Sequence, residues 1–86
     1  MAAEQATILA CMATAGIADA NRRDRISDDL FPNFEALHST TTTELETTLT
    51  QHANNRVAAQ RIVLPAMQRK GLKNMLLWFH DNRDVT

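Results

Sequence analysis

The 86-residue sequence is poor in residues that cross-link, bend or loosen a chain: it has one cysteine, two glycines, two prolines and no tyrosine. One cysteine excludes an intramolecular disulfide, which fits a reducing compartment. Two glycines cannot build a glycine-rich phosphate-binding loop, and so few glycines and prolines exclude a long flexible linker. We therefore expect one intracellular, cytoplasmic domain over residues 1–86.

Long apolar runs and a positively charged N-terminus are also missing. No hydrophobic stretch approaches the roughly 20 residues of a membrane-spanning helix, so we expect no membrane association. The first 21 residues contain no lysine or arginine, whereas a secretory signal peptide begins with positive charge. Although Ala18-Asp19-Ala20 resembles a cleavage site, an amphipathic first helix is the preferred interpretation.

Opposite charges are concentrated in different parts of the chain. Residues 1–46 carry eight acidic and three basic residues, whereas residues 47–80 carry five basic residues and no acidic one. The net charge is −1, so there is no overall attraction to nucleic acid. Whether this charge separation along the sequence becomes a separation in space depends on the fold.

Apolar spacing predicts helices and no strands in the first part of the chain. A first helix over about residues 3–15 is followed by Gly16, which suits a left-handed C-terminal cap. Asp19 is placed to cap a short second helix. Ser27 or Asp28 offers a further cap before the apolar cluster of residues 30–37, which we expect in the core.

Pro32, inside that cluster, suits the first turn of a helix. The threonine run that follows predicts another helix start, because Thr41 with Glu44, or Thr43 with Glu46, has the spacing of a capping box. The resulting helix is expected over about residues 42–53, with Leu45 and Leu49 on its buried face.

The longest predicted helix runs from Pro65 to about residue 82, after an extended segment at residues 62–64. Its buried face is predicted from apolar residues at three- and four-residue steps: Met67, Leu72, Met75, Leu76 and Phe79. Leu77 and Trp78 extend the apolar surface around the helix beyond that face. This predicts a surface that binds a partner, and a second copy of this chain is one candidate. Gly71 either permits the close approach of another helix or is simply exposed.

The order of these segments resembles a sterile alpha motif (SAM) domain. The resemblance rests on the Gly16-Ile17 turn, the cluster DLFPNFEAL, the capped helix TTTELETTL and the long last helix, which match over most of the chain. The segment from Ile26 onward, including LPAMQRKGLKNMLLWFHDNRD, is also similar to uncharacterised SAM-like segments of retroelement polyproteins. The chain departs from the SAM pattern at Asn54-Asn55, where the family has a glycine turn, and in the extra residues 56–64.

The resemblance implies a compact SAM-like bundle of about five helices that acts as a contact module. SAM domains often associate head to tail, the middle of one domain binding the start of the last helix of another. Opposite charges steer such contacts, although exposed charges are more often simply solvated. The predicted interaction surface comprises Asp28, Asp29, Glu35, Arg56, Arg61, Arg69, Lys70, Lys73 and Trp78. The expected partner is a protein, and a second copy of this chain is the candidate that would give a homo-oligomer.

The main alternative is a small helical nucleic-acid-binding domain that uses the basic segment 56–73 to contact phosphates. The acidic overall balance favours the protein-interaction interpretation.

No catalytic, cofactor or metal site is predicted. His38, His52 and His80 lack the spacing of zinc ligands, and Cys11 suits the core better than a nucleophilic triad. We expect His52 at the edge of the core and His80 on the surface near a helix end. The sequence therefore predicts a non-enzymatic domain without a cofactor.

Overall fold

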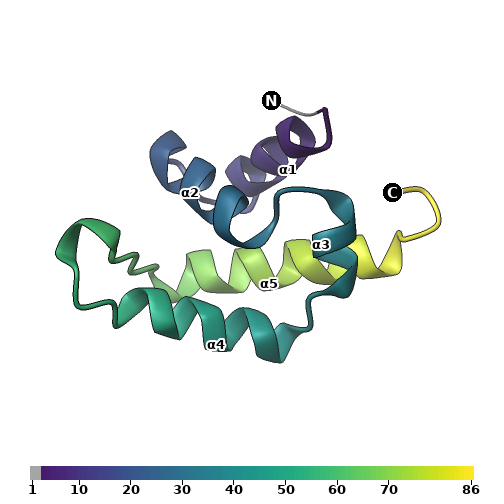
Figure 1. The fold of residues 1–86 in the computed structure, drawn as a ribbon. Coiled ribbons are helices and arrows are strands. Elements are labelled where there is room, and N and C mark those ends of the chain that lie inside the picture. Colours follow the sequence, from purple (N-terminus) through teal and green to yellow (C-terminus); the bar gives the residue numbers. More distant parts are fainter. Residues whose placement is uncertain (1–2) are drawn as a thin grey trace.

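The structure, a computed structural model, describes residues 3–86, and most of that part of the chain is helical (Figure 1). Its elements are α1 (Ala3–Thr14), α2 (Ala20–Leu30), α3 (Phe34–Ser39), α4 (Thr42–Ala53), the 3-10 turn η1 (Ala58–Gln60) and α5 (Ala66–Asp81). Residues 3–86 contain no strand. The all-α class, the five α-helices and the long last helix are therefore confirmed.

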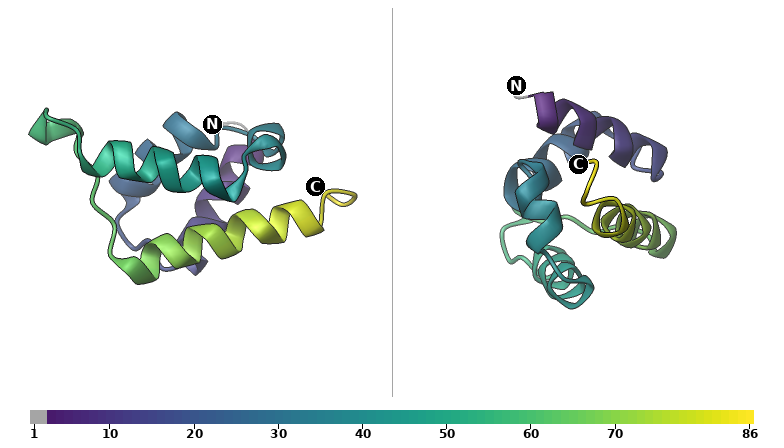
Figure 2. Two further views of the ribbon diagram at one scale, coloured as in Figure 1. Left: turned by 90° about the horizontal axis from the view of Figure 1, so that it is seen from below. Right: turned by 90° about the vertical axis from the view of Figure 1, so that its right-hand side faces the viewer.

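Helix α5 is the element along which the bundle is assembled. Helices α1, α3 and α4 each contact it, and α2 packs on α1. When α5 is viewed nearly end-on, α1 and α4 lie on different sides of it (Figure 2). The radius of gyration is 12.2 Å, close to the roughly 12 Å of a globular chain of this length, so these helices form one compact body.

The core receives side chains from every α-helix and from the turns between them. Its buried apolar residues are Ile8, Met12, Ile17, Ile26, Phe31, Leu37, Leu45, Leu49, Ile62, Leu64, Leu72, Met75, Leu76 and Phe79. The cluster predicted at residues 30–37 belongs to it, because Phe31 and Leu37 are fully buried and Phe34 packs against the core. The rings of Phe34 and Phe79 lie 5.4 Å apart, centroid to centroid, and join α3 to α5.

Helix α1 ends in the glycine cap that the sequence predicts. Gly16 has a φ of +107°, a backbone conformation that costs glycine little. Its N–H donates to the carbonyl of Ala13, and the N–H of Ile17 donates to the carbonyl of Met12, each over 3.1 Å. These are the two hydrogen bonds of a Schellman motif. The turn brings Ile17 back onto the core, where it is fully buried.

Side-chain caps begin the next helices. The carboxylate of Asp19 accepts a hydrogen bond from the N–H of Arg22 at 3.1 Å, at the start of α2. The hydroxyl of Thr41 accepts one from the N–H of Glu44 at 3.1 Å, at the start of α4. Each satisfies a backbone donor that the first helical turn leaves unpaired. Both caps confirm positions predicted from residue spacing.

Two predicted features near residue 30 are wrong. Helix α2 continues to Leu30, so neither Ser27 nor Asp28 caps a new helix. Ser27 is buried instead, and its hydroxyl donates to the carbonyl of Phe31 at 3.0 Å. The cap of α3 is Asn33, and Pro32 precedes that cap rather than lying in the first turn. The core contacts of Ile26 and Phe31 favour a longer α2 over a second start.

A third wrong prediction concerns Met67, which is 85% exposed rather than buried. One helical turn separates Met67 from Gly71, and a further two turns lead to Trp78. Met67 therefore lies on the outer line of α5 with Trp78, whereas the core contacts come from the line of Leu72, Leu76 and Phe79. A step of three or four residues from a buried position can reach either the buried line or the outer line of the helix. Spacing alone therefore did not place Met67 correctly.

Candidate functional site

The predicted acidic residues are exposed, and two of them contact other helices. A carboxylate oxygen of Asp28 accepts a hydrogen bond from Gln5 at 2.7 Å, which joins α2 to α1. A carboxylate oxygen of Asp29 lies 3.3 Å from Nε2 of His52 near the end of α4. Glu35 is exposed on α3. The three acids therefore do not form one continuous patch: Glu35 belongs to a separate cleft, described below.

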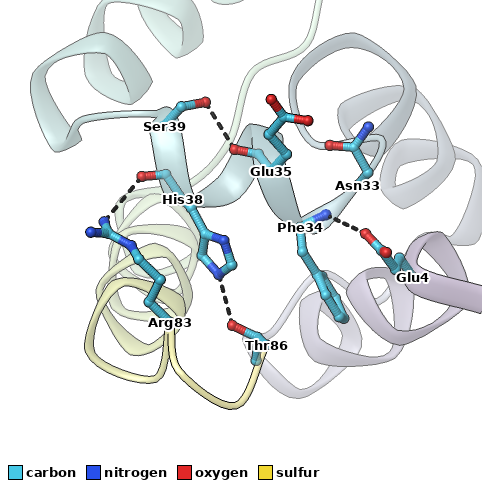
Figure 3. A pocket seen from close by; sticks show the side chains of 8 residues that line it. All are labelled: Glu4, Asn33, Phe34, Glu35, His38, Ser39, Arg83 and Thr86. Carbon is cyan, nitrogen blue, oxygen red and sulfur yellow. Dashed lines mark hydrogen bonds between the residues drawn. The ribbon is translucent and has the colours of Figure 1, made fainter.

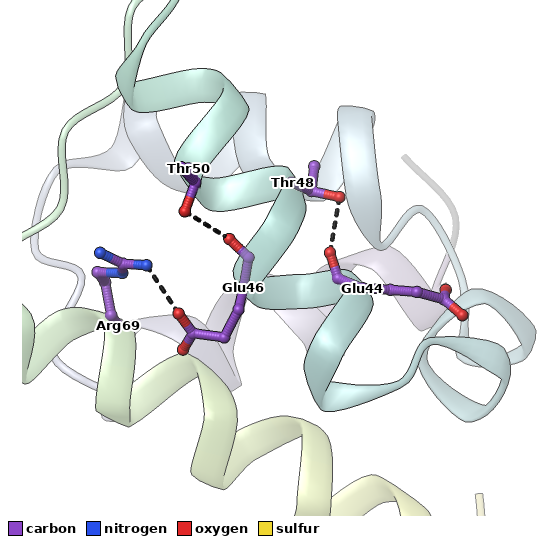
Figure 4. Close-up of polar contacts among 5 residues, drawn as sticks. All are labelled: Glu44, Glu46, Thr48, Thr50 and Arg69. Atoms are coloured by element: carbon purple, nitrogen blue, oxygen red, sulfur yellow. Dashed lines mark hydrogen bonds and ion pairs between the residues drawn. The ribbon is translucent and has the colours of Figure 1, made fainter.

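The predicted basic residues divide into two groups. Arg69 on α5 forms an ion pair with Glu46 on α4, with a 2.7 Å distance between Nη2 and Oε2 (Figure 4). Arg61 donates from Nε to the carbonyl of Asn55 at 2.9 Å, inside the loop after α4. Both cations hold the fold together. Three others are exposed and make no side-chain hydrogen bond or ion pair within residues 3–86: Arg56, Lys70 and Lys73.

Charges that are separated along the sequence are neighbours in space. The ion pair of Glu46 and Arg69 joins the acidic part of the chain to the basic part. On α2, Arg25 donates to the carbonyl of Gln60 at 2.7 Å, and Asp29 contacts His52. The acidic and basic parts of the chain therefore meet where α4 packs on α5.

Helix α5 carries three large exposed apolar side chains, two near its end and one near its start. Trp78 is 52% exposed and Leu77 is 42% exposed, and Met67 lies further toward the start of the helix. The Trp78 ring meets the ring of Phe79 edge-on, with 5.2 Å between centroids. Four of the predicted interaction residues lie on this helix: Arg69, Lys70, Lys73 and Trp78. Large exposed apolar side chains that lie together on a small domain indicate a contact surface.

Trp78 also lines a groove of about 690 Å³ between α1 and α5. The wall from α1 includes Thr7, Ala10, Cys11 and Thr14, and the wall from α5 includes Asn74 and Met75. The helices come close at one end of this groove, because a Cβ on Gly71 would collide with the carbonyl oxygen of Ala15. Of the two interpretations of Gly71, close approach of a helix is therefore correct.

Cys11 is half-buried in this groove. Burial raises the pKa of its thiol, because removing a thiolate from water is unfavourable. Cys11 forms part of the wall of the groove, and a raised pKa makes its thiol less readily ionised to the reactive thiolate.

A second and more polar cleft, about 610 Å³ in volume, lies where α1, α3 and the C-terminal segment meet (Figure 3). A carboxylate oxygen of Glu4 accepts from the N–H of Phe34 at 2.9 Å. His38 contacts the hydroxyl of Thr86 at 2.7 Å. Arg83 donates to the carbonyl of His38 at 3.3 Å. These groups are hydrogen-bonded to one another and hold the ends of three segments together.

The other two histidines have partners in the fold as well. His52 is half-buried at the edge of the core, as predicted, and faces Asp29. His80 is half-buried too, and its Nε2 donates to the carbonyl of Leu37 at 3.0 Å. Across the described residues, no group of three histidine, cysteine or acidic side chains is placed to hold a metal ion. None of the helices in that part of the chain has the length and hydropathy of a membrane span.

No protein-family model, curated protein or solved structure matches this chain. The outer face of α5, which carries Met67, Leu77 and Trp78, and the adjoining groove are therefore identified as the candidate site from their geometry alone. The predicted residue Trp78 belongs to this surface, but the groove itself was missed, since it exists only where α1 meets α5. Gly71 was the one signal for it in the sequence.

Proposed function

We propose that this chain is a non-enzymatic, SAM-like protein-interaction domain that binds a second copy of itself. One observation carries the proposal: α5 exposes Met67, Leu77 and Trp78, together with an apolar groove beside Trp78. A domain of this size has a thin core, so large side chains left in water are costly unless a partner covers them.

The area of Trp78 gives a magnitude for this argument. A buried aromatic side chain removes about 150–250 Å² from water, and Trp78 is still 52% exposed, which leaves about 100 Å². At about 25 cal/mol per Å², covering it contributes about 2.5 kcal/mol per copy. Association costs about 4–15 kcal/mol in lost freedom of movement. Two tryptophans reach the lower end of that range, and Met67 and Leu77 add to it.

The polar groups of the chain support a contact role more than a chemical one. In the cleft at α3, the carboxylate of Glu4, the imidazole of His38 and the guanidinium of Arg83 form internal hydrogen bonds, and the carboxylate of Glu35 is exposed. Burial raises the pKa of the Cys11 thiol and so disfavours its reactive thiolate form. Neither arrangement supplies an activated nucleophile beside a general base.

Sedimentation velocity over a concentration series tests the proposal. We expect a monomer that converts to a dimer as concentration rises, at high salt as well as low, because apolar contacts are not screened by salt. Leu77→Ser should weaken the dimer, whereas Val85→Ser, at a more exposed apolar site outside α5, should leave it unchanged. A monomer at every concentration and at both salt levels would refute the proposal.

The nucleic-acid alternative has less support. Two cations of the segment 56–73, Arg61 and Arg69, already bind partners within the fold. The remaining three could neutralise at most about three phosphates, which predicts a shallow logarithmic salt slope of about −3 for duplex DNA. Titration with duplex and single-stranded oligonucleotides at two salt concentrations measures this, and tight, salt-dependent binding would favour the alternative.

A further inference from the structure

The outer face of α5 repeats with the spacing of a helix-packing seam. Along this face, successive residues are separated by alternating steps of three and four: Met67, Lys70, Asn74, Leu77 and Asp81. Trp78 lies beside them. Such alternation keeps residues on one side of a helix and suits packing against another helix. All of these side chains are exposed. In the end-on view of Figure 2, the side of α5 away from α1 and α4 has no other helix against it.

The charges on this face are arranged so that the face complements itself. Lys70 and Asp81 stand eleven positions apart on α5, about 16 Å along the helix axis at 1.5 Å per residue. Neither forms an ion pair within the described residues. A second α5 running in the opposite direction presents its own aspartate to the lysine and its own lysine to the aspartate. A parallel second helix in register would place like charges together.

The helix dipole favours the same antiparallel arrangement. Asp81 is the last residue of α5, where the unpaired carbonyl groups carry partial negative charge and disfavour a carboxylate. A lysine from a second, antiparallel copy would sit beside this terminus and offset both the carboxylate and the dipole. The position of Asp81 is unfavourable in the isolated chain and favourable in the pair.

The groove offers a place for the half-exposed tryptophan. When two antiparallel α5 helices are related by a two-fold axis at the level between Met75 and Leu76, Leu77 of each copy stands opposite Asn74 of the other, and Trp78 lies beside it, opposite Lys73. Asn74 lines the groove between α1 and α5, whose volume is about 690 Å³. A large aromatic side chain that enters a groove at the centre of an interface is the usual form of a binding hot spot.

We propose that the partner of the α5 face is a second α5, packed antiparallel in a closed two-fold dimer, with Lys70 of each copy opposite Asp81 of the other. This inference rests on the proposed self-association and assigns its surface and symmetry. A two-fold contact uses the same patch on both copies and stops at the dimer. A head-to-tail contact between acidic and basic patches would instead continue into a chain of copies.

The single tryptophan reports directly on this surface. Emission and acrylamide quenching of Trp78 are measured over the same concentration series as sedimentation. If the inference holds, the emission maximum moves to shorter wavelength and quenching falls as the dimer forms, because Trp78 passes from water into the groove. Dimer formation without any change in Trp78 would overturn the inference and leave the proposed function standing. The absence of any dimer would overturn both.

Charge reversal tests the symmetry. Lys70→Glu and Asp81→Lys should each weaken the dimer by about tenfold in Kd, and the double variant should return to within about threefold of the parent chain. Arg56→Glu is the matched control, since it reverses an exposed cation outside α5. Circular dichroism checks that every variant stays helical. A double variant as weak as the single ones, or a loss confined to Arg56→Glu, refutes the antiparallel pairing.

Discussion

Replacing Gly71 by alanine sets helix propensity against packing, and the two effects have opposite signs. Alanine is favoured over glycine inside a helix by about 1 kcal/mol, so propensity alone predicts a more stable protein. The structure predicts the reverse, because the added Cβ would meet the carbonyl oxygen of Ala15 well inside contact distance. The obstructing atom belongs to the backbone of Ala15, in the turn directly after α1, and cannot rotate aside as a flexible side chain would.

The size of the effect follows from these two terms. Overpacking costs typically about 1–3 kcal/mol, and a backbone obstacle places Gly71→Ala near the upper value. Subtracting about 1 kcal/mol for propensity leaves a net loss of about 2 kcal/mol. For a domain of this length, that lowers Tm by about 8–16 °C.

Thermal and urea unfolding followed by circular dichroism measure this change in stability. Lys73→Ala is the matched control, since Lys73 is exposed on the same helix and its replacement should stay within about 0.5 kcal/mol of the parent chain. An unchanged or raised Tm for Gly71→Ala would show that α1 does not approach α5 at this point. The groove beside Trp78 would then lose its structural basis as well.

Three further perturbations give defined results. Asp19→Ala removes the cap of α2 and should cost about 1 kcal/mol in unfolding free energy, whereas Asp19→Asn should retain most of it; equal losses would exclude capping as the cause. A double-mutant cycle with Glu46→Gln and Arg69→Gln should give a coupling of at most about 1 kcal/mol that falls with added salt, because the pair is partly exposed; a larger, salt-independent coupling would contradict this. Burial raises the pKa of the Cys11 thiol, so at pH 8 less thiolate is present in the folded than in the unfolded protein. Iodoacetamide should therefore react more slowly with folded protein than with protein in urea, and equal rates would refute the assignment.

Helix boundaries were the most predictable part of this fold. The glycine cap at Gly16, the carboxylate cap at Asp19 and the hydroxyl cap at Thr41 all depend on atoms within a few residues of one another. Such interactions are encoded by short spacings, which a sequence displays directly. The same locality explains the start of α5 after Pro65, whose ring fixes φ near the helical value and whose missing N–H is not needed there.

Prediction became weaker where two local signals competed. Ser27 has the chemistry of a cap, yet it lies buried inside α2 and donates to the carbonyl of Phe31. Residues on both sides of it, Ile26 and Phe31, are fully buried, and continuing the helix lets both reach the core. Packing of these two side chains outweighed the preference of one hydroxyl for a helix start.

The candidate surface depended most on tertiary structure. Trp78 and Leu77 were predicted to extend beyond the core face, and their exposure confirms it. The burial of Met67 was predicted wrongly, because periodicity gives the direction of a side chain around its own helix and says nothing about which neighbour covers it.

By itself, the sequence determined an all-α chain with five helices, most of their ends and most of the core, because these follow from spacings shorter than about two turns. Only the tertiary structure decided that Gly71 meets Ala15, that Arg69 pairs with Glu46, and that a groove opens beside Trp78. Each of these depends on residues more than twenty positions apart, or on two helices at once. Their distances are set by how the whole bundle packs, and no local pattern records them.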